Sequence, residues 1–213
     1  MRLPLLLMML AAASARADEW WGWTMMELHR TETTNTGLFL GNRLDADDGA
    51  YVQIISPRHK QRVLPWLDMG AGLSLLEIEN LSEGGRFLQF RPELEINPHL
   101  DLTPRLRLDL RNRMEWRWNE REEITIHRSR HRLQLGWKTP DGTGPLARVF
   151  ASNEWLSDLH RGQWWENRAV PLGLTFETSK HTELDLFYMI FSVRQQATWR
   201  HESVLGTYLR VRF

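Results

Sequence analysis

The strongest constraint on the fold is a two-residue alternation of apolar and charged side chains, clearest over residues 105–118. Leu106, Leu108 and Leu110 share one face with Met114 and Trp116, and Asn112 is the single polar interruption. The other face is charged throughout: Arg105, Arg107, Asp109, Arg111, Arg113, Glu115 and Arg117. Because the side chains of a β-strand point alternately to its two faces, this segment is predicted to be a strand with one apolar and one charged face.

The same period recurs from residue 20 to the end of the chain, with turn-forming residues between segments. We expect eleven strand-like segments, at residues 21–31, 36–44, 50–63, 66–79, 86–96, 105–118, 124–138, 147–157, 164–177, 182–194 and 201–213. No helical period of comparable length and no change of composition separates them. The pattern predicts a single all-β domain over residues 18–213.

The first 17 residues have the pattern of a secretory signal peptide. Met1-Arg2 is a short positive region, residues 3–13 are mostly apolar, and Ala15-Arg16-Ala17 fits a cleavage site. The apolar stretch is too short to cross about 30 Å of hydrocarbon as a helix. We therefore expect residues 1–17 to be removed and the mature chain to begin at Asp18, in an exported protein.

Composition favours a membrane barrel over a water-soluble globule. Mean hydropathy is −0.46 and a quarter of the residues are charged, yet the chain has 11 tryptophans. Most lie near the ends of alternating segments, where they are expected to form aromatic girdles at a bilayer interface. The chain has no cysteine and a formal net charge of zero, so disulfides, thiolate metal sites and a global attraction to nucleic acid are not expected.

The last strand ends on an aromatic residue. Leu209, Val211 and Phe213 share one face, while Arg210 and Arg212 lie on the other. This ending resembles the terminal strand of Gram-negative outer-membrane barrels, which the barrel-assembly machinery reads. Such barrels normally have an even strand number and both termini on the periplasmic side. Eleven segments therefore predict a transmembrane antiparallel barrel of either ten or twelve strands, with the choice left open.

A register can be predicted for residues 86–96 against 105–118. If the connection is centred on Leu100, three pairs of opposite charge face each other. These pairs are Arg91 with Asp109, Glu93 with Arg107, and Glu95 with Arg105. A shift of two residues would place like charges opposite each other, which is unfavourable. Pro92 cannot donate a backbone hydrogen bond, so a bulge is expected at that residue.

Several phrases of the sequence resemble a family of small proteobacterial outer-membrane barrels, the domain-of-unknown-function family number twenty-four ninety. The matching phrases are Leu110 to Arg117, Asn153-Glu154-Trp155, Asn167-Arg168 with Gly173, and the ending His201 to Phe213. The resemblance covers most of residues 18–213. It implies an outer-membrane location and a barrel architecture, and it carries no catalytic residue.

The charged faces would line the barrel interior. Candidate lumen residues are Arg111, Arg113, Glu115, Arg117, Arg130, Glu154, Arg168 and Arg210. One interpretation is an interior that attracts anionic solutes. The other is a narrow barrel filled by arginine–carboxylate pairs. Glu154 and Arg168 would pair across adjacent strands only if a bulge reverses the alternation in the second strand.

Enzymatic and metal chemistry have weaker signals. Ser129, His131 and Asn153 are the nearest candidates for a lipid hydrolase, and Asp45, Asp47 and Asp48 are better explained as turn residues. His127 and His131 share a face, but the neighbouring arginines disfavour a metal cation. We expect no cofactor and no metal, and outer-membrane lipids and the assembly machinery as partners.

The sequence thus predicts a non-enzymatic outer-membrane barrel that is structural or a narrow, porin-like pore. A barrel enzyme acting on lipid or envelope substrates, or a soluble periplasmic β-protein, are the alternatives. The transported solute and the oligomeric state stay open.

Overall fold

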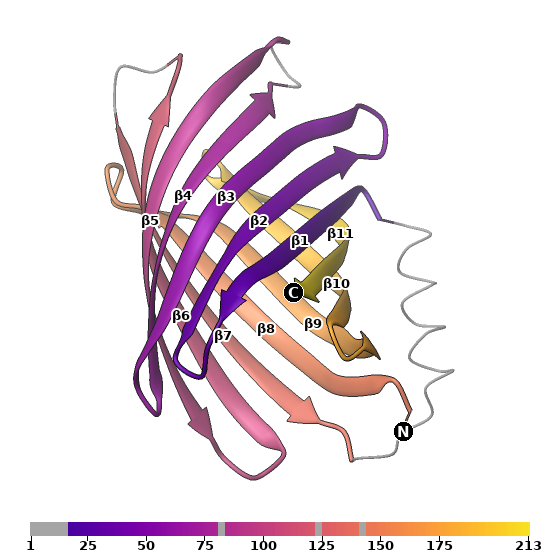
Figure 1. Ribbon diagram of the computed structural model, residues 1–213. Coiled ribbons are helices and arrows are strands. Elements are labelled where there is room, and N and C mark those ends of the chain that lie inside the picture. Colours follow the sequence, from indigo (N-terminus) through magenta and orange to yellow (C-terminus); the bar gives the residue numbers. More distant parts are fainter. Residues whose placement is uncertain (1–16, 81–83, 122–124, 141–143) are drawn as a thin grey trace.

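The computed structural model describes residues 17–80, 84–121, 125–140 and 144–213. Within these ranges the chain forms eleven strands, closed into one barrel, and no helix (Figure 1). No helix in the described ranges is long and apolar enough to cross a bilayer. The strands are β1 (Glu19–Arg30), β2 (Thr34–Asp45), β3 (Gly49–Leu64), β4 (Leu67–Glu79), β5 (Arg86–Asp101), β6 (Leu106–Asn119), β7 (Ile126–Lys138), β8 (Leu146–Asp158), β9 (Gln163–Ser179), β10 (Thr182–Gln195) and β11 (Thr198–Arg212).

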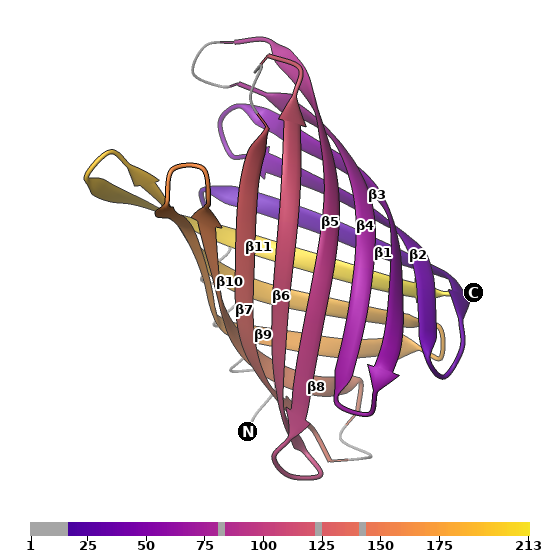
Figure 2. The ribbon, with the colours of Figure 1, turned by 90° about the vertical axis from the view of Figure 1, so that its left-hand side faces the viewer.

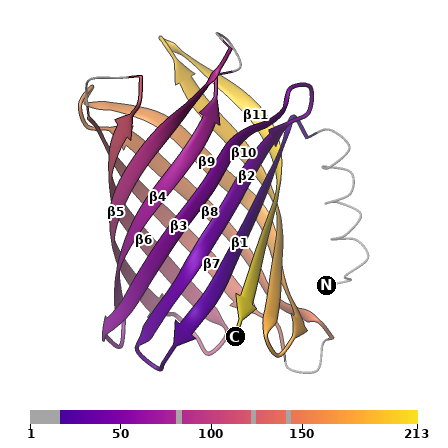
Figure 3. The same ribbon diagram turned by 45° about the horizontal axis from the view of Figure 1, so that its top comes forward.

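Each strand pairs antiparallel with its neighbour in the chain, and the barrel closes where β1 and β11 pair in parallel. Glu19 lies opposite Val204, and Glu27 lies opposite Arg212. Figure 3 shows β1 and β11 side by side, with both arrows directed to the same end. Parallel closure is the pairing that an odd number of alternating strands requires.

The all-β barrel is confirmed, and its strand number lies between the ten and twelve expected. All eleven segments recognised in the sequence are strands within the described residues. The expectation that the termini share one end was wrong, because an odd strand number sends them to opposite ends. We call the end at Phe213 the C-terminal end and the end where β1 begins the N-terminal end.

The predicted register between β5 and β6 was wrong. Asn97-Pro98 does not end β5, which continues to Asp101, so the turn lies farther along the chain. Glu93 consequently lies opposite Glu115, and Glu95 lies opposite Arg113. The like-charge rule failed because the charges are compensated by residues of several strands rather than by the directly opposite one.

Pro92 and Pro98 leave the register of β5 unchanged. Both are paired with β4, opposite Leu73 and Leu67, while the pairing with β6 is interrupted at each proline. Since proline has no N–H, the missing donor interrupts one ladder locally. The predicted bulge at Pro92 is therefore not formed; the two strands keep the same alignment on both sides of it.

The wall has an apolar outer face and a polar inner face. Figure 2 shows β5, β6 and β7 side by side on the near face of the barrel. The outer side of this region exposes large apolar side chains, among them Leu88, Phe90, Leu94, Ile96, Leu110, Leu133 and Leu135. The inner side buries charged ones, among them Arg91, Glu93, Arg113, Glu115, Arg128 and Arg130. This distribution is the reverse of that in a water-soluble protein.

The tryptophans are divided between the two faces. Trp66, Trp118, Trp137 and Trp164 are exposed near strand ends. Trp21 is instead fully buried, in an interior cluster of Trp21, Phe150, Val170, Phe187, Met189, Phe191 and Val204 with Trp23 packed against it. The interpretation of the tryptophans as residues of a bilayer interface therefore does not hold for Trp21 and Trp23.

Candidate functional site

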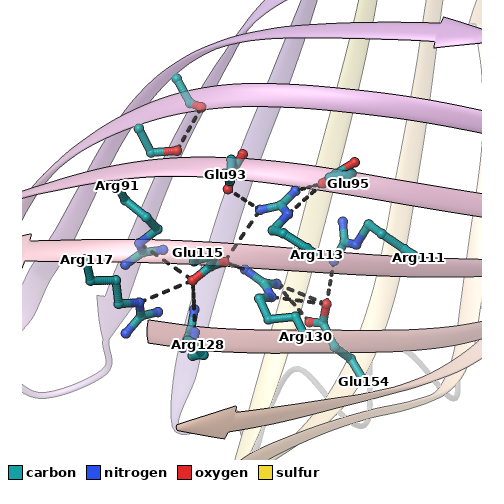
Figure 4. Close-up of polar contacts among 12 residues, drawn as sticks. Arg91, Glu93, Glu95, Arg111, Arg113, Glu115, Arg117, Arg128, Arg130 and Glu154 are labelled. Carbon is teal, nitrogen blue, oxygen red and sulfur yellow. Dashed lines mark hydrogen bonds and ion pairs between the residues drawn. The ribbon is translucent and has the colours of Figure 1, made fainter. Parts of the chain in front are cut away.

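The carboxylate of Glu115 on β6 is the centre of a charged network inside the barrel (Figure 4). Glu115 is fully buried. Its oxygens lie 2.8 Å from Arg128 Nη2, 2.8 Å from Arg130 Nη1 and 3.2 Å from Arg117 Nε. Arg91 and Arg113 lie farther away, each at 3.8 Å. Five guanidinium groups from β5, β6 and β7 thus surround one carboxylate.

Glu154 on β8 is the second centre. It accepts a hydrogen bond from Arg111 Nη2 at 2.5 Å and one from Arg130 Nη2 at 2.9 Å, and it lies 3.8 Å from Arg168 Nη1. Arg130 therefore bridges Glu115 and Glu154. Such charge-assisted, forked contacts are stronger than neutral hydrogen bonds and fix the geometry of the groups they join.

Glu93 and Glu95 extend the network toward β5. Arg113 donates from Nη1 to Glu93 at 2.6 Å and from Nε to Glu95 at 2.6 Å. Glu93 also contacts Arg58 of β3 at 3.2 Å. The network consequently joins strands β3, β5, β6, β7, β8 and β9, which make up more than half of the wall.

The expected contact between Glu154 and Arg168 is present, with the bulge that it requires. The two residues are direct partners across β8 and β9. The register of β9 shifts around Pro171 against both neighbours, between Phe150 and Ser152 on β8 and between Tyr188 and Ile190 on β10. This shift lets β9 place Arg168 and the later Thr175 on the same inner face.

Arg168 connects the charged network to the aromatic cluster. Its guanidinium carbon lies 4.9 Å from the Trp21 ring centroid and 5.8 Å from that of Phe191. Arg43 lies over the Trp21 ring at 3.9 Å. Glu166 binds Arg168 and contacts Arg128 at 3.4 Å. We call Trp21, Glu115, Arg128, Glu166 and Arg168 the closing layer, because their contacts run from β1 across the interior to β9, β7 and β6.

A cavity of about 350 Å³ lies on the C-terminal side of the closing layer. On β6 it is lined by Arg111 and Arg113, whereas Glu115, one step nearer the N-terminal end, does not line it. A smaller hollow of about 240 Å³ at the β1–β2 turn shares Glu27, Asn35 and Lys60 with the cavity. The cavity therefore extends toward the C-terminal end, and Arg168 of the closing layer contributes to its lining.

The structure places seven of the candidate lumen residues in one network: Arg111, Arg113, Glu115, Arg117, Arg130, Glu154 and Arg168. Arg210 lies on another part of the wall and contacts Glu183 and Asp185 of β10, each at 2.9 Å. Arg58 and Lys60 of β3 were not among the residues expected in the lumen, although both share the inner face with Arg62 in an alternating segment. The alternation of residues 58, 60 and 62 in the sequence could have identified both as inward-facing residues.

The three C-terminal candidates for assembly recognition lie at the end of β11. Leu209 is opposite Leu184 and Val211 is opposite Thr182 in the β10–β11 ladder. Phe213 is largely exposed at the end of the chain. Their recognition by an assembly machinery stays a prediction.

The hydrolase candidates lie on the outer face rather than in the interior. Ser129 and His131 alternate with the inward Arg128 and Arg130 on β7. Asn153 is opposite Leu133, and the partner of His131 is instead Asn112, with Nδ1 2.8 Å from Oδ1. In the sequence, Asn112 stood out only as a polar interruption in an apolar face.

The remaining acidic candidates lie in a turn, and the remaining histidine lies on the outer face. Asp45 Oδ1 accepts backbone hydrogen bonds from Asp47 and Asp48 at 2.9 and 3.1 Å, which is the expected turn role. Within the described residues, no group of three or more histidines and carboxylates is arranged to hold a metal ion. His127 lies opposite Trp116 on the outer face.

Replacement of Glu115 by glutamine should strongly destabilise the barrel. The substitution keeps the shape of the side chain and leaves five arginines without their shared charge, so a loss of about 3–5 kcal/mol in unfolding free energy is expected. Glu79→Gln is the control, since the Glu79–Arg86 contact at 3.2 Å is partly exposed and should cost at most about 1 kcal/mol. Urea unfolding in detergent micelles, followed by gel mobility, measures both; equal losses would contradict the central role of Glu115.

One comparison with known proteins identifies the chain. A family model described as "Protein of unknown function (DUF2490)" matches residues 10–202. Neither the curated proteins nor the solved structures contain a match. The match spans most of the chain and agrees with the resemblance found in the sequence. The chain belongs to this family of proteins of unknown function.

Proposed function

We propose that the chain is an outer-membrane β-barrel protein whose interior is closed by charged and aromatic side chains. The observation that carries the proposal is the inverted wall, which is apolar outside and charged inside. In this role the barrel is a structural or solute-holding element of the membrane, and outer-membrane lipids cover its wall.

The outer wall supports the membrane location. Leu94 and Ile96, in the middle of β5, are each exposed by more than half of their surface. They belong to a continuous apolar surface over β4 to β7, a kind of surface that water-soluble monomers rarely expose. The soluble periplasmic alternative leaves this surface without a partner, whereas a bilayer covers it.

Export is supported by the sequence of residues 1–17, of which residues 1–16 lie outside the described part of the chain. Asp18, the first residue of the proposed mature chain, accepts hydrogen bonds from the backbone N–H and Oγ of Ser203, at 2.7 and 2.8 Å. These bonds hold the pKa of the Asp18 carboxyl below its usual value. A chain beginning at Asp18 would therefore keep the contact that attaches its first residue to β11.

The closing layer supports a closed interior over an open pore. Trp21 and Glu115 are both fully buried, and Arg168 fills the space between the aromatic cluster and the carboxylates. In a small barrel, side chains of this size are sufficient to fill the cross-section. The narrow-pore interpretation would require these contacts to break during passage.

A cysteine at Leu94 tests the membrane location. The chain has no native cysteine, so Leu94→Cys and, as control, Asp48→Cys in the β2–β3 turn each introduce a single thiol. After fractionation of expressing Gram-negative cells, the protein is expected in the outer-membrane fraction. A charged maleimide should react at least about tenfold faster with the turn thiol, because lipid covers Leu94. Recovery in the periplasmic supernatant, with equal reactivity at the two positions, would contradict the proposal.

One contact favours a second candidate function, a lipid hydrolase on the outer wall. With His131 protonated on Nδ1, that nitrogen donates to Asn112 Oδ1 at 2.8 Å and leaves Nε2 free to act as a base. Ser129 is two residues away on the same face of β7, about 7 Å between Cα atoms in an extended strand. A polar pair on an otherwise apolar wall facing lipid is costly, and such residues often have functional roles.

The hydrolase candidate predicts that Ser129→Ala abolishes phospholipid turnover by the purified, folded barrel. Ser157→Ala is the matched control, because Ser157 lies on the outer face directly opposite Ser129 on β8. Release of fatty acid from mixed phospholipid–detergent micelles is the measurement. Turnover that is absent in the unchanged protein, or unaffected by Ser129→Ala, would eliminate this candidate.

A further inference from the structure

The cavity holds more positive charge than its own carboxylates balance. Ten arginine and lysine side chains line it, against four glutamates. The glutamates are not evenly shared: Glu93 and Glu95 are bound by Arg113, and Glu154 is bound by Arg111 and Arg130. The excess charge therefore falls on the cations that form no ion pair with these carboxylates, although Arg132 lies opposite Glu154 in the β7–β8 ladder.

Two of the lining cations are without a partner. Within residues 17–80, 84–121, 125–140 and 144–213, the side chains of Lys60 and Arg132 have neither a hydrogen bond nor an ion pair. Arg132 lies directly opposite Arg111 in the β6–β7 ladder. Arg111 shares Glu154 with two other arginines, and its own Nε is buried without a hydrogen-bond partner.

These three cations converge from different parts of the wall. Lys60 of β3 interacts electrostatically with Arg111 and Arg132 across the cavity. The carboxylates that attract Lys60 most strongly are those of Glu95 and Asp68. Glu95 is already held by Arg113, and Asp68 contacts Arg62 at 3.3 Å. We call Lys60, Arg111 and Arg132 the cation triad.

The cation triad has the chemistry of a phosphate site. Like charges facing each other in a poorly screened interior repel, so the arrangement is stabilised by an anion between them. A guanidinium group presents two parallel N–H donors that match two oxygens of a phosphate, and an ammonium group adds a point charge. The cavity volume of about 350 Å³ is within the range of sites for small molecules.

The position of the triad gives the site a single entrance. Lys60 is shared by the cavity and the hollow at the C-terminal end, so a solute reaches the triad from that end. The closing layer then prevents passage to the N-terminal end. A solute that enters is held and leaves by the same route.

We propose that Lys60, Arg111 and Arg132 form a binding site for a phosphate group, entered from the C-terminal end of the barrel. The inference rests on the closed interior proposed above and is independent of the membrane location. A phosphate group is the class of ligand that the charged interior favours.

The test is phosphate binding by the folded full-length barrel in detergent micelles, with inorganic phosphate and pyrophosphate as probes. Isothermal titration at constant ionic strength is expected to show saturable binding. Arg132→Gln and Lys60→Gln should each weaken it by about tenfold or more, since each removes a charged donor. Arg107→Gln is the control: Arg107 contacts Asp109 at 2.8 Å, does not line the cavity, and should leave binding unchanged.

Thermal unfolding separates a binding role from a structural one. Without phosphate, Arg132→Gln should unfold at the same temperature as the unchanged protein or at a higher one, because it removes an uncompensated charge. Added phosphate should raise the unfolding temperature of the unchanged protein and of Arg107→Gln, and should raise that of Arg132→Gln less.

Several results would overturn the proposal. They are absence of binding by the unchanged protein, equal binding by Arg132→Gln and Lys60→Gln, and an unfolding temperature lowered by Arg132→Gln in the absence of phosphate. Tighter binding of a tricarboxylate than of pyrophosphate would refute the assigned ligand class. Because these measurements are made in micelles, they are independent of where fractionation locates the protein.

Discussion

The barrel depends on the attraction between the buried Glu115 carboxylate and the arginines around it. Neither partner is favourable inside the wall alone, since an isolated buried charge costs several kcal/mol. Together they let β5, β6 and β7 fill the interior with charged side chains while their apolar side chains face outward. Arg130 extends the same interaction to Glu154 on β8, and Arg168 joins it to Trp21 on β1.

Two different kinds of packing divide the interior. Charged contacts dominate from β5 to β9, while aromatic and aliphatic side chains of β1 and β8 to β11 form the cluster around Trp21. Gly206 permits this packing, because a Cβ at that position would overlap the ring of Phe187. The two regions meet at Arg168, whose guanidinium contacts rings on one side and carboxylates on the other. The proposed closure of the interior depends on this junction, and the cavity lies where the charges are no longer balanced.

The alternation in the sequence was sufficient to predict the strands and the inner faces of β6 and β7, because side-chain direction in a strand is a local property. Registers were not predictable in the same way. Glu93 faces Glu115 because each carboxylate is balanced by arginines of other strands, and the pairing of Arg111 with Arg132 places two like charges opposite each other. The parallel pairing of β1 with β11 uses backbone groups, which leave no mark in the side-chain pattern. The contact of Asn112 was not predicted because its partner, His131, lies on another strand.

We infer that charged and aromatic side chains close the interior of a barrel embedded in a membrane. Conductance of the folded protein in planar lipid bilayers tests it most directly. The protein is expected to insert, as shown by heat-modifiable mobility of the recovered sample, and to produce no stable ion current. Replacement of Trp21 and Arg168 by alanine should then open a path and allow current. Steady current through the unchanged protein, proportional to salt concentration as in a water-filled pore, would contradict a closed interior.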